Sequence, residues 1–119
     1  MFDNPDKALT LNGREHWAVK GSRVKTWRAT TFINARQQLI EPYDLGPSLV
    51  KVSFRFRQNR RRDPHNYFAT VKPIIDGLVD AGLWPDDTPD HVATLEPELL
   101  VVKGHPNACH IEIWPKGEL

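Results

Sequence analysis

Residues 48–57, with the sequence SLVKVSFRFR, alternate between apolar and polar side chains. Successive side chains of a β-strand point to opposite faces of a sheet, so the pattern predicts a strand with one buried face. A sheet with one buried face needs helices to cover it, which favours a layered α/β (α+β) sandwich. Val50, Val52, Phe54 and Phe56 are expected to face the core, and Leu49, Lys51, Ser53, Arg55 and Arg57 to form a cationic outer side that is a candidate surface for DNA or a partner.

A helix that could cover this strand is predicted directly after it. Asp63 and Pro64 have the residue types of a helix start, an N-cap aspartate followed by proline at the first helical position. Gly82 is expected to end the helix, and Pro73 is expected to kink it or divide it. The buried stripe at helical spacing consists of Phe68, Val71, Ile75, Leu78 and Val79.

Weaker patterns predict the other elements. Residues 7–12 suit a short first strand and residues 22–39 a helix. Residues 94–103 and 108–114 predict two more strands, with Pro97 indicating an edge position or a start at Glu98. The expected architecture is one domain over residues 1–119, with one mixed four-stranded sheet and two helices.

Charge is distributed unevenly along a chain whose net formal charge is only +1. Residues 1–62 carry 13 Lys and Arg against 5 Asp and Glu, whereas residues 63–119 carry 3 against 10. This division indicates a polyanion-binding surface beside an acidic pocket, and the alternative is a chance imbalance on a solvated surface.

Several other classes of protein lack support in the sequence. No apolar run approaches the roughly 18 residues of a membrane span, and no glycine-rich phosphate-binding loop predicts a nucleotide cofactor. The first residues lack the layout of a secretion signal. The single cysteine, Cys109, excludes an internal disulfide, so a cytoplasmic location is expected.

The candidate site lies in residues 60–87, where arginines and carboxylates are combined. Mg²⁺ is held by one or two carboxylates together with water and substrate phosphate, so Asp63, Asp86 and Asp87 are candidate ligands. His65 is a further candidate, since imidazole suits Mn²⁺ better than Mg²⁺. Asp63 and Asp87 can meet only if the loop after the helix folds back along it. The simpler interpretation is that Asp63 only caps the helix and that the aspartate pair only forms a turn.

Lys72 is the one lysine of the predicted helix. Beside a metal site its ammonium would stabilise a transition-state phosphate, and its spacing also permits an ion pair with Asp76. Trp27 is expected in the core, whereas Trp17 is expected either in the core or stacked on unpaired bases. Basic side chains would hold phosphates or simply be solvated. The candidate DNA-binding residues are Arg60, Arg61, Arg62, Arg14, Lys20, Arg23, Lys25 and Arg28.

This central stretch resembles the RusA family of Holliday-junction resolvases. RRRD-x-x-N, followed by K-x-x-x-D-x-L-x-x-A-G-x-W-x-D-D, is similar to that family's arginine-rich segment, D-x-D-N motif, lysine-bearing helix and aspartate pair after Ala-Gly. The matching residues are Arg62, Asp63, Asn66, Lys72, Asp76, Leu78, Ala81, Gly82, Trp84, Asp86 and Asp87.

The resemblance implies a homodimeric, Mg²⁺-dependent crossover junction endodeoxyribonuclease that acts on four-way DNA junctions in recombination and repair, with Mn²⁺ as a possible metal. It implies that Asp63 and Asp87 are metal ligands, that Lys72 is the catalytic lysine, and that Arg62 contacts DNA. Asp86 is the weaker member of the aspartate pair. A role in a phage or prophage is expected from the same analogy.

Two departures from the family pattern concern the first half of the stretch. His65 stands where the family has the second aspartate of D-x-D-N, and the segment from Asn66 to Lys72 is three residues longer. If the extra residues displace Asp63 and His65, Asp76 becomes a candidate replacement ligand. Two other hypotheses therefore remain, a junction-binding protein that does not cleave and a structural or interaction domain with no metal site.

Overall fold

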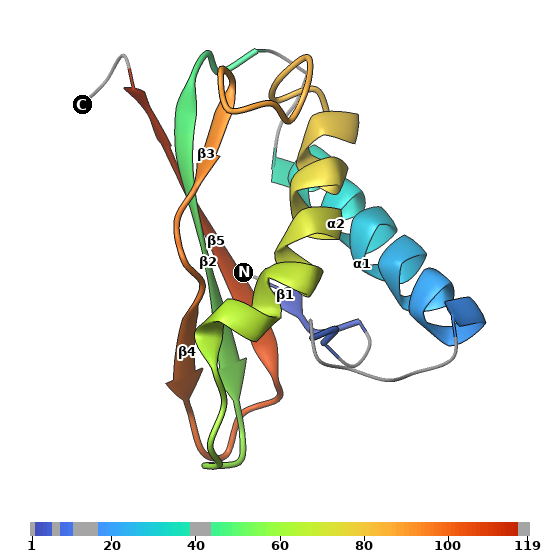
Figure 1. Ribbon diagram of the computed structural model, residues 1–119, viewed down its shortest axis with the longest axis vertical. Coiled ribbons are helices and arrows are strands. Elements are labelled where there is room, and N and C mark those ends of the chain that lie inside the picture. The colour runs from blue at the N-terminus through green and yellow to red at the C-terminus, as the bar shows by residue number, and fades with distance from the viewer. Residues whose placement is uncertain (1, 6–7, 11–16, 39–43, 117–119) are drawn as a thin grey trace.

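The computed structural model describes residues 2–5, 8–10, 17–38 and 44–116. One mixed sheet carries two helices on one of its faces, so the expected α+β architecture is confirmed (Figure 1). The elements are β1 (Phe2–Asp3), α1 (Trp17–Gln38), β2 (Ser48–Phe56), the 3₁₀ turn η1 (Pro64–Tyr67), α2 (Phe68–Asp80), β3 (Val92–Thr94), β4 (Glu98–Val101) and β5 (Ala108–Pro115).

Strand β2 is the centre of the sheet. It pairs antiparallel with β5 along one side, and parallel with β3 and then β4 along the other. Strand β1 adds a short antiparallel pairing beyond β5. Val50, Val52 and Phe54 are fully buried and Phe56 is 6% exposed, so the predicted core face is confirmed. Ser53, expected on the outer side, is also buried.

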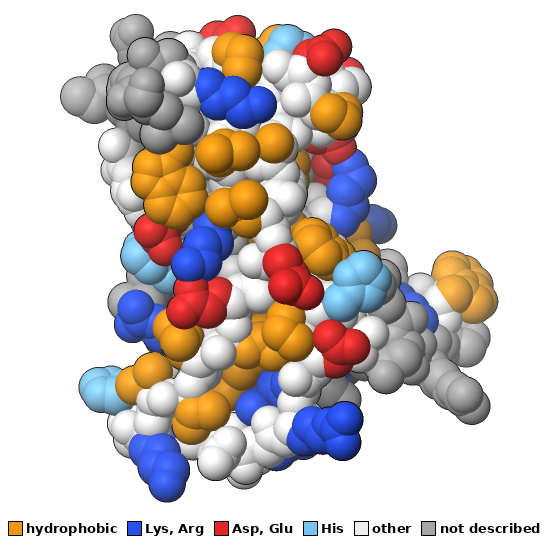
Figure 2. Space-filling model, turned by 60° about the vertical axis from the view of Figure 1, so that its left-hand side comes forward, with side chains coloured by type: hydrophobic (Ala, Val, Ile, Leu, Met, Phe, Trp, Pro, Cys, Tyr) orange, Lys and Arg blue, Asp and Glu red, His pale blue; other side chains and the backbone are white. Residues whose placement is uncertain are grey.

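The outer face of the sheet is mixed in charge rather than strongly cationic. Lys51 forms an ion pair with Glu98 of β4 and lies opposite Glu112 of β5. Figure 2 shows hydrophobic and oppositely charged side chains interspersed on this open side. Sequence alone could not predict this neutralisation, because the acidic neighbours of Lys51 come from strands that lie 47 and 61 positions later in the chain.

The sheet has five described strands instead of the expected four, and its first strand lies elsewhere than expected. The expected strand over residues 94–103 begins only at Glu98, as β4, which confirms the late start that Pro97 indicated, because proline has no N–H to donate to the ladder. The strand that was not expected is β3, which shares only Thr94 with the predicted range. The expected first strand over residues 7–12 is not formed where it is described. Residues 8–10 are not extended into the sheet, and the strand at this end of the chain is β1.

Leu9 shows why that segment leaves the sheet. Its backbone N–H donates to Thr70 Oγ1 at 2.8 Å, and Thr70 Oγ1 donates to the Leu9 carbonyl at 2.7 Å. Both backbone groups of Leu9 are therefore satisfied by a buried hydroxyl on α2 instead of by a neighbouring strand. The contact fixes the N-terminal segment against the second helix.

Helix α2 runs without interruption through Pro73, which is buried. The change in helical type occurs earlier, between η1 and α2, so the proline does not divide the helix as one alternative supposed. Gly82 has φ of 93°, and the backbone N–H of Leu83 donates to the Leu78 carbonyl at 3.3 Å. These features are those of a glycine C-terminal cap, as the sequence predicted.

Helix α1 begins at Trp17, five residues before the expected start, and carries no acidic side chain. Trp27 is 0% exposed and packs edge-on to Phe54, so its predicted core position is confirmed. Trp17 is 79% exposed and is not a core residue. Among the described residues, no helix combines the length and the apolar content that crossing a membrane requires.

Candidate functional site

Lys72 is the centre of a group of charged side chains on the exposed side of α2. Its Nζ donates to Asp76 Oδ1 at 3.0 Å and also donates to Asp87 Oδ2. The lysine side chain is 63% exposed, and those of Asp76 and Asp87 are 23% and 28% exposed. Two carboxylates that are distant in sequence from each other therefore converge on one cationic group.

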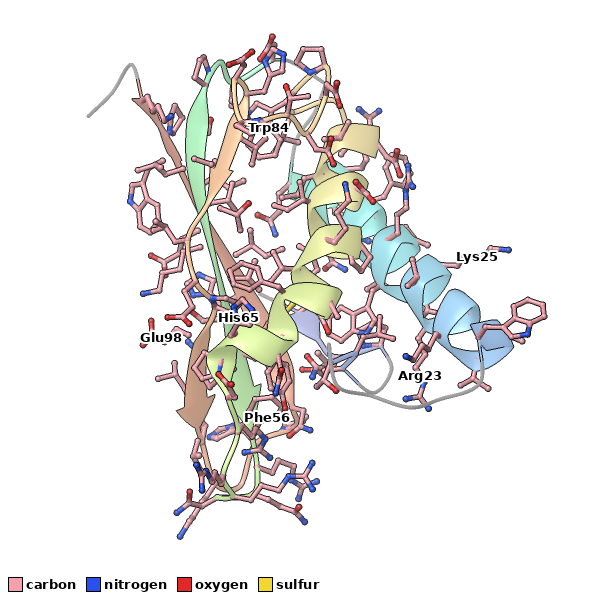
Figure 3. All side chains as sticks on the ribbon, viewed as in Figure 1. Arg23, Lys25, Phe56, His65, Trp84 and Glu98 are labelled. Carbon is pink, nitrogen blue, oxygen red and sulfur yellow. The ribbon has the colours of Figure 1, made fainter. Side chains whose placement is uncertain are left out.

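This convergence requires the loop after α2 to fold back along the helix, and it does so. Leu83 and Trp84 are buried and anchor the loop in the core. Trp84 Nε1 donates to the Gly46 carbonyl at 3.0 Å and to Ser48 Oγ at 3.1 Å, which ties the loop to the start of β2 (Figure 3). Asp87 lies three positions after Trp84, and its backbone N–H donates to Asp86 Oδ1 at 2.7 Å.

A second cation, Arg28 of α1, extends the group across the two helices. Its Nε and Nη2 donate to the two carboxylate oxygens of Asp80 at 2.6 and 2.8 Å, a bidentate pair. Its Nη1 lies 4.0 Å from Asp76 Oδ2. Asp76 therefore lies between Lys72 and Arg28, and the group runs from Asp87 through Asp76 to Asp80.

Gly77 makes this cross-helix contact possible. A Cβ at this position would lie 2.5 Å from the Arg28 carbonyl oxygen and 2.8 Å from Thr31 Cβ. The two helices therefore approach so closely at Gly77 that no larger residue fits without displacing backbone. Asp76 precedes Gly77 and Asp80 is three residues after it, so both carboxylates lie within reach of Arg28.

The charges in this group stabilise one another. The hydrogen bond from Lys72 holds the pKa of Asp87 below its usual value, and the bonds from Asp87 and then Asp76 raise the pKa of Lys72. The hydrogen bond from Arg28 likewise lowers the pKa of Asp80. At neutral pH Lys72 is therefore a fixed ammonium, and the carboxylates of Asp80 and Asp87 are ionised.

Asp63 and His65 lie at the other end of the helical segment. Asp63 caps η1, with its Oδ1 accepting from the backbone N–H of His65 at 3.1 Å, as the simpler interpretation expected. The His65 ring packs edge-on to Phe68, with centroids 5.5 Å apart. The whole of η1 and the first turn of α2 separate Asp63 from Lys72 in the chain.

The candidate metal ligands are thus placed in two groups. Asp76, Asp86 and Asp87 are near Lys72, whereas Asp63 and His65 are at the start of η1. Within residues 2–5, 8–10, 17–38 and 44–116, no three or more His, Cys, Asp or Glu side chains are arranged to hold a metal ion. The carboxylates of Asp76 and Asp87, which here contact the Lys72 ammonium, are nevertheless of the type that binds Mg²⁺. Mg²⁺ takes its other ligands from water and phosphate.

The three consecutive arginines before η1 are not equivalent. Arg60 and Arg61 are exposed. Arg62 is partly buried, with its guanidinium carbon 3.8 Å from the centroid of the Phe56 ring and its Nη1 donating to the Gln58 carbonyl at 3.0 Å. Arg62 therefore braces the loop that presents the other two.

The basic residues predicted on the first helix are only partly described. Arg14 lies outside the described residues. Lys25 is exposed and points away from the sheet (Figure 3), whereas Lys20 and Arg23 are half-buried. Arg28 contributes its charge to Asp80, a role that the sequence did not predict. The sequence feature that could have indicated this contact is a glycine, Gly77, between two carboxylates, Asp76 and Asp80, on one predicted helix.

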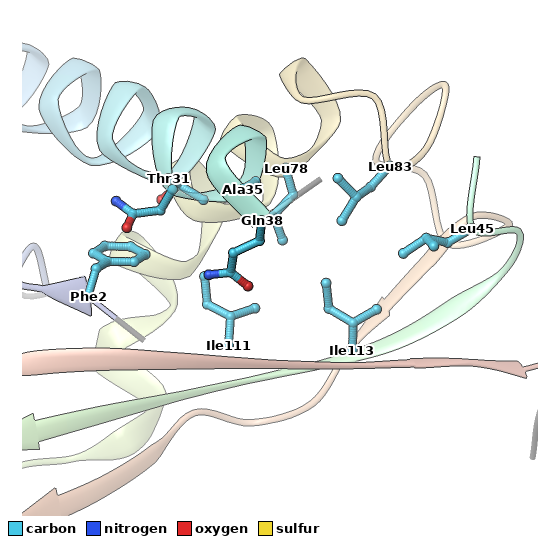
Figure 4. A pocket seen from close by; sticks show the side chains of 10 residues that line it. Phe2, Thr31, Ala35, Gln38, Leu45, Leu78, Leu83, Ile111 and Ile113 are labelled. Atoms are coloured by element: carbon cyan, nitrogen blue, oxygen red, sulfur yellow. The ribbon is translucent and has the colours of Figure 1, made fainter. Parts of the chain in front are cut away.

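Two other features lie apart from this group. Cys109 is buried, and burial raises the pKa of its thiol to about 12, in agreement with a structural residue. An apolar cavity of about 200 Å³ lies between α1 and β5, lined by side chains that include Ala35, Ile111 and Ile113 (Figure 4). None of the charged residues around Lys72 lines this cavity.

The chain matches no protein-family model. A search of the curated proteins likewise finds no match.

Proposed function

We propose that this protein is a metal-dependent, structure-selective DNA endonuclease that resolves four-way junctions by paired phosphodiester hydrolysis, similar to the RusA family. The observation that carries the proposal is the return of Asp87 to Lys72. The family resemblance pairs a catalytic lysine with an aspartate after the Ala-Gly sequence, and these two residues are in contact here although fifteen positions separate them.

Each side chain has a role in this proposal. Lys72 remains protonated because of its carboxylate partners, so it serves as a fixed positive charge for a phosphate oxygen or the leaving oxygen and not as a base. Asp87, with Asp76 or Asp86, would hold a divalent cation. A bound Mg²⁺ or Mn²⁺ would supply an activated water and neutralise charge that develops on the phosphodiester. Asp63 and His65 remain candidates for contacts nearer the start of η1.

The proposal includes a homodimer acting on branched DNA in the cytoplasm. A four-way junction has two-fold symmetry and must be nicked on two strands, which a dimer with two equivalent sites would do. Arg60, Arg61 and the basic residues of α1 are proposed to contact the phosphate backbone.

A second candidate function is junction binding without cleavage. The observation that favours it is that the described residues contain no group of three metal-ligating side chains, with Asp63 and His65 apart from Asp87. Incubation of the protein with a labelled four-way junction, in Mg²⁺ and separately in Mn²⁺, distinguishes the two. Nuclease function predicts symmetric nicks in at least one metal, and binding without nicks in either would leave only the second candidate.

A further inference from the structure

A recess beside β1, the edge strand of the sheet, lies apart from the Lys72 group. Its volume is about 260 Å³, and it is formed by β1, the end of β2, the start of β5 and the segment over residues 102–107 that joins β4 to β5. Its lining consists of Asp3, Arg55 and His105, together with the apolar surface of Phe2, Val102, Pro106 and Ala108. The recess therefore combines both signs of charge with an apolar wall.

Strand register places an acid and a base on the same face of the sheet, with a small residue between them. Asp3 of β1 and Arg55 of β2 both pair with Ala108 of β5. Neighbouring strands are about 4.8 Å apart, so the Cα atoms of Asp3 and Arg55 are about 10 Å apart. Ala108 carries only a methyl group, which leaves space between the two charged side chains, and this space is part of the recess.

The two opposite charges do not neutralise each other. No ion pair among the described residues includes Asp3 or Arg55, although both side chains line the recess. Arg55 Nε is also buried and has no hydrogen-bond partner within the described part of the chain. A buried donor without a partner costs free energy, which a bound acceptor would recover.

The chemistry of the recess selects a small molecule that carries both charges. A carboxylate would accept from Arg55 in the bidentate geometry that arginine favours, once the guanidinium turns Nε and one Nη toward the recess. An ammonium would bind the carboxylate of Asp3, and an apolar side chain would pack against Val102 and Pro106. Asp3 disfavours a ligand that has only negative charge, because like charges repel.

We propose that this recess binds a free α-amino acid with an apolar side chain, with Arg55 binding its carboxylate and Asp3 its ammonium. A concave site with an apolar wall and a few polar groups that fix orientation is typical of small-molecule binding. A residue inside a peptide lacks the free ammonium and carboxylate on one carbon, so it does not match both charged side chains. Amino-acid binding uses none of the residues around Lys72 and is therefore independent of the proposed nuclease function.

The test is a titration of the isotopically labelled protein with leucine, followed by NMR amide shifts in the absence of metal and DNA. Saturable shifts are expected at Val102 and Ala108. Two analogues each lack one charge: isocaproate has no ammonium, and isoamylamine has no carboxylate. Each should bind at least about tenfold more weakly than leucine, because it leaves one charged side chain of the recess unmatched.

Three variants separate the parts of the site. Arg55→Gln should weaken leucine binding roughly tenfold and remove the preference for leucine over isoamylamine, and Asp3→Asn should do the same for the preference over isocaproate. Ala108→Val keeps both charges but fills part of the recess, so it should also weaken leucine binding. Lys103→Gln is the matched control, because this residue lies in the same connecting segment and does not line the recess.

Discrimination against both analogues, lost in the corresponding variant and kept in Lys103→Gln, supports the amino-acid site whether or not the protein cleaves DNA. Shifts that do not saturate with leucine, or equal affinity for leucine and both analogues, overturn it and leave the nuclease proposal intact. Leucine binding that all three site variants leave unchanged overturns it as well. The analogue comparison uses the intact protein, so it decides the question even if the melting temperature shows that a variant does not fold.

Discussion

Lys72 is the residue on which the account of the site depends. Sequence left two interpretations for it, a partner of phosphate and an i,i+4 partner of Asp76, and the structure contains the second. The contact with Asp87 could not be derived from spacing, because it depends on how a loop is anchored by Trp84. The motif resemblance pointed to both residues, and tertiary structure places them in contact.

Replacing Lys72 with methionine should raise the pKa of Asp87. The lysine hydrogen bond is the main cause of the lowered value, and methionine keeps the length of the side chain without the charge. NMR titration of the carboxyl carbons would measure the change. An unchanged Asp87 titration would mean that the two groups are not in contact in solution.

Gly77→Ala should destabilise the protein. The new Cβ would collide with the Arg28 carbonyl and with Thr31, and overpacking of this kind costs about 1–3 kcal/mol. Gly21→Ala is the matched control, because it also lies in a helix but its Cβ would meet nothing within 4 Å. Helix propensity predicts that the control is more stable by roughly 0.5–1 kcal/mol. Urea denaturation would measure both, and equal effects would contradict the close crossing of α1 and α2.

At the scale of elements, the best-predicted features were those that local pattern determines. The apolar residues of 48–56 predicted the buried face of β2, because that face depends on the side-chain period of a strand. Gly82 predicted the end of α2, because that end depends on backbone conformation. The prediction of a first strand over residues 7–12 was wrong because the Leu9 backbone forms hydrogen bonds with the Thr70 hydroxyl, a contact between residues sixty-one positions apart. No local pattern contains that information.

The two helices are joined by the ion pair of Arg28 and Asp80, which should make stability depend on pH. Because folding lowers the pKa of Asp80, its contribution is present above the unfolded value of about 3.9 and is lost as pH falls through the folded value. Asp80→Asn should therefore lower the melting temperature near pH 7 and have progressively less effect in acid. The pair is partly exposed, so the loss should be about 1 kcal/mol or less. A difference that persists unchanged in strong acid would contradict this origin.

At the scale of the whole molecule, charged residues gather in two places. The Lys72 group lies on the helical layer, whereas Arg57 and the three consecutive arginines 60–62 lie where the chain leaves β2. The uneven charge of the sequence predicted a basic surface and an acidic group, but not the neutral mixture on the outer face or the pairing of Arg28 with acidic residues. Halves of a sequence are not halves of a fold, so charge counts alone could not place these regions.

The most direct test of the central claim is the mapping of nicks on a four-way junction labelled on each strand in turn. The intact protein, Asp87→Asn, Lys72→Met and the loop control Asp90→Asn would be compared in Mg²⁺ and in Mn²⁺, with binding measured in parallel. The account predicts paired symmetric nicks by the intact protein and by Asp90→Asn, and junction binding with cleavage reduced at least a hundredfold in the other two. Cleavage by Asp87→Asn and Lys72→Met at the rate of the intact protein would contradict it.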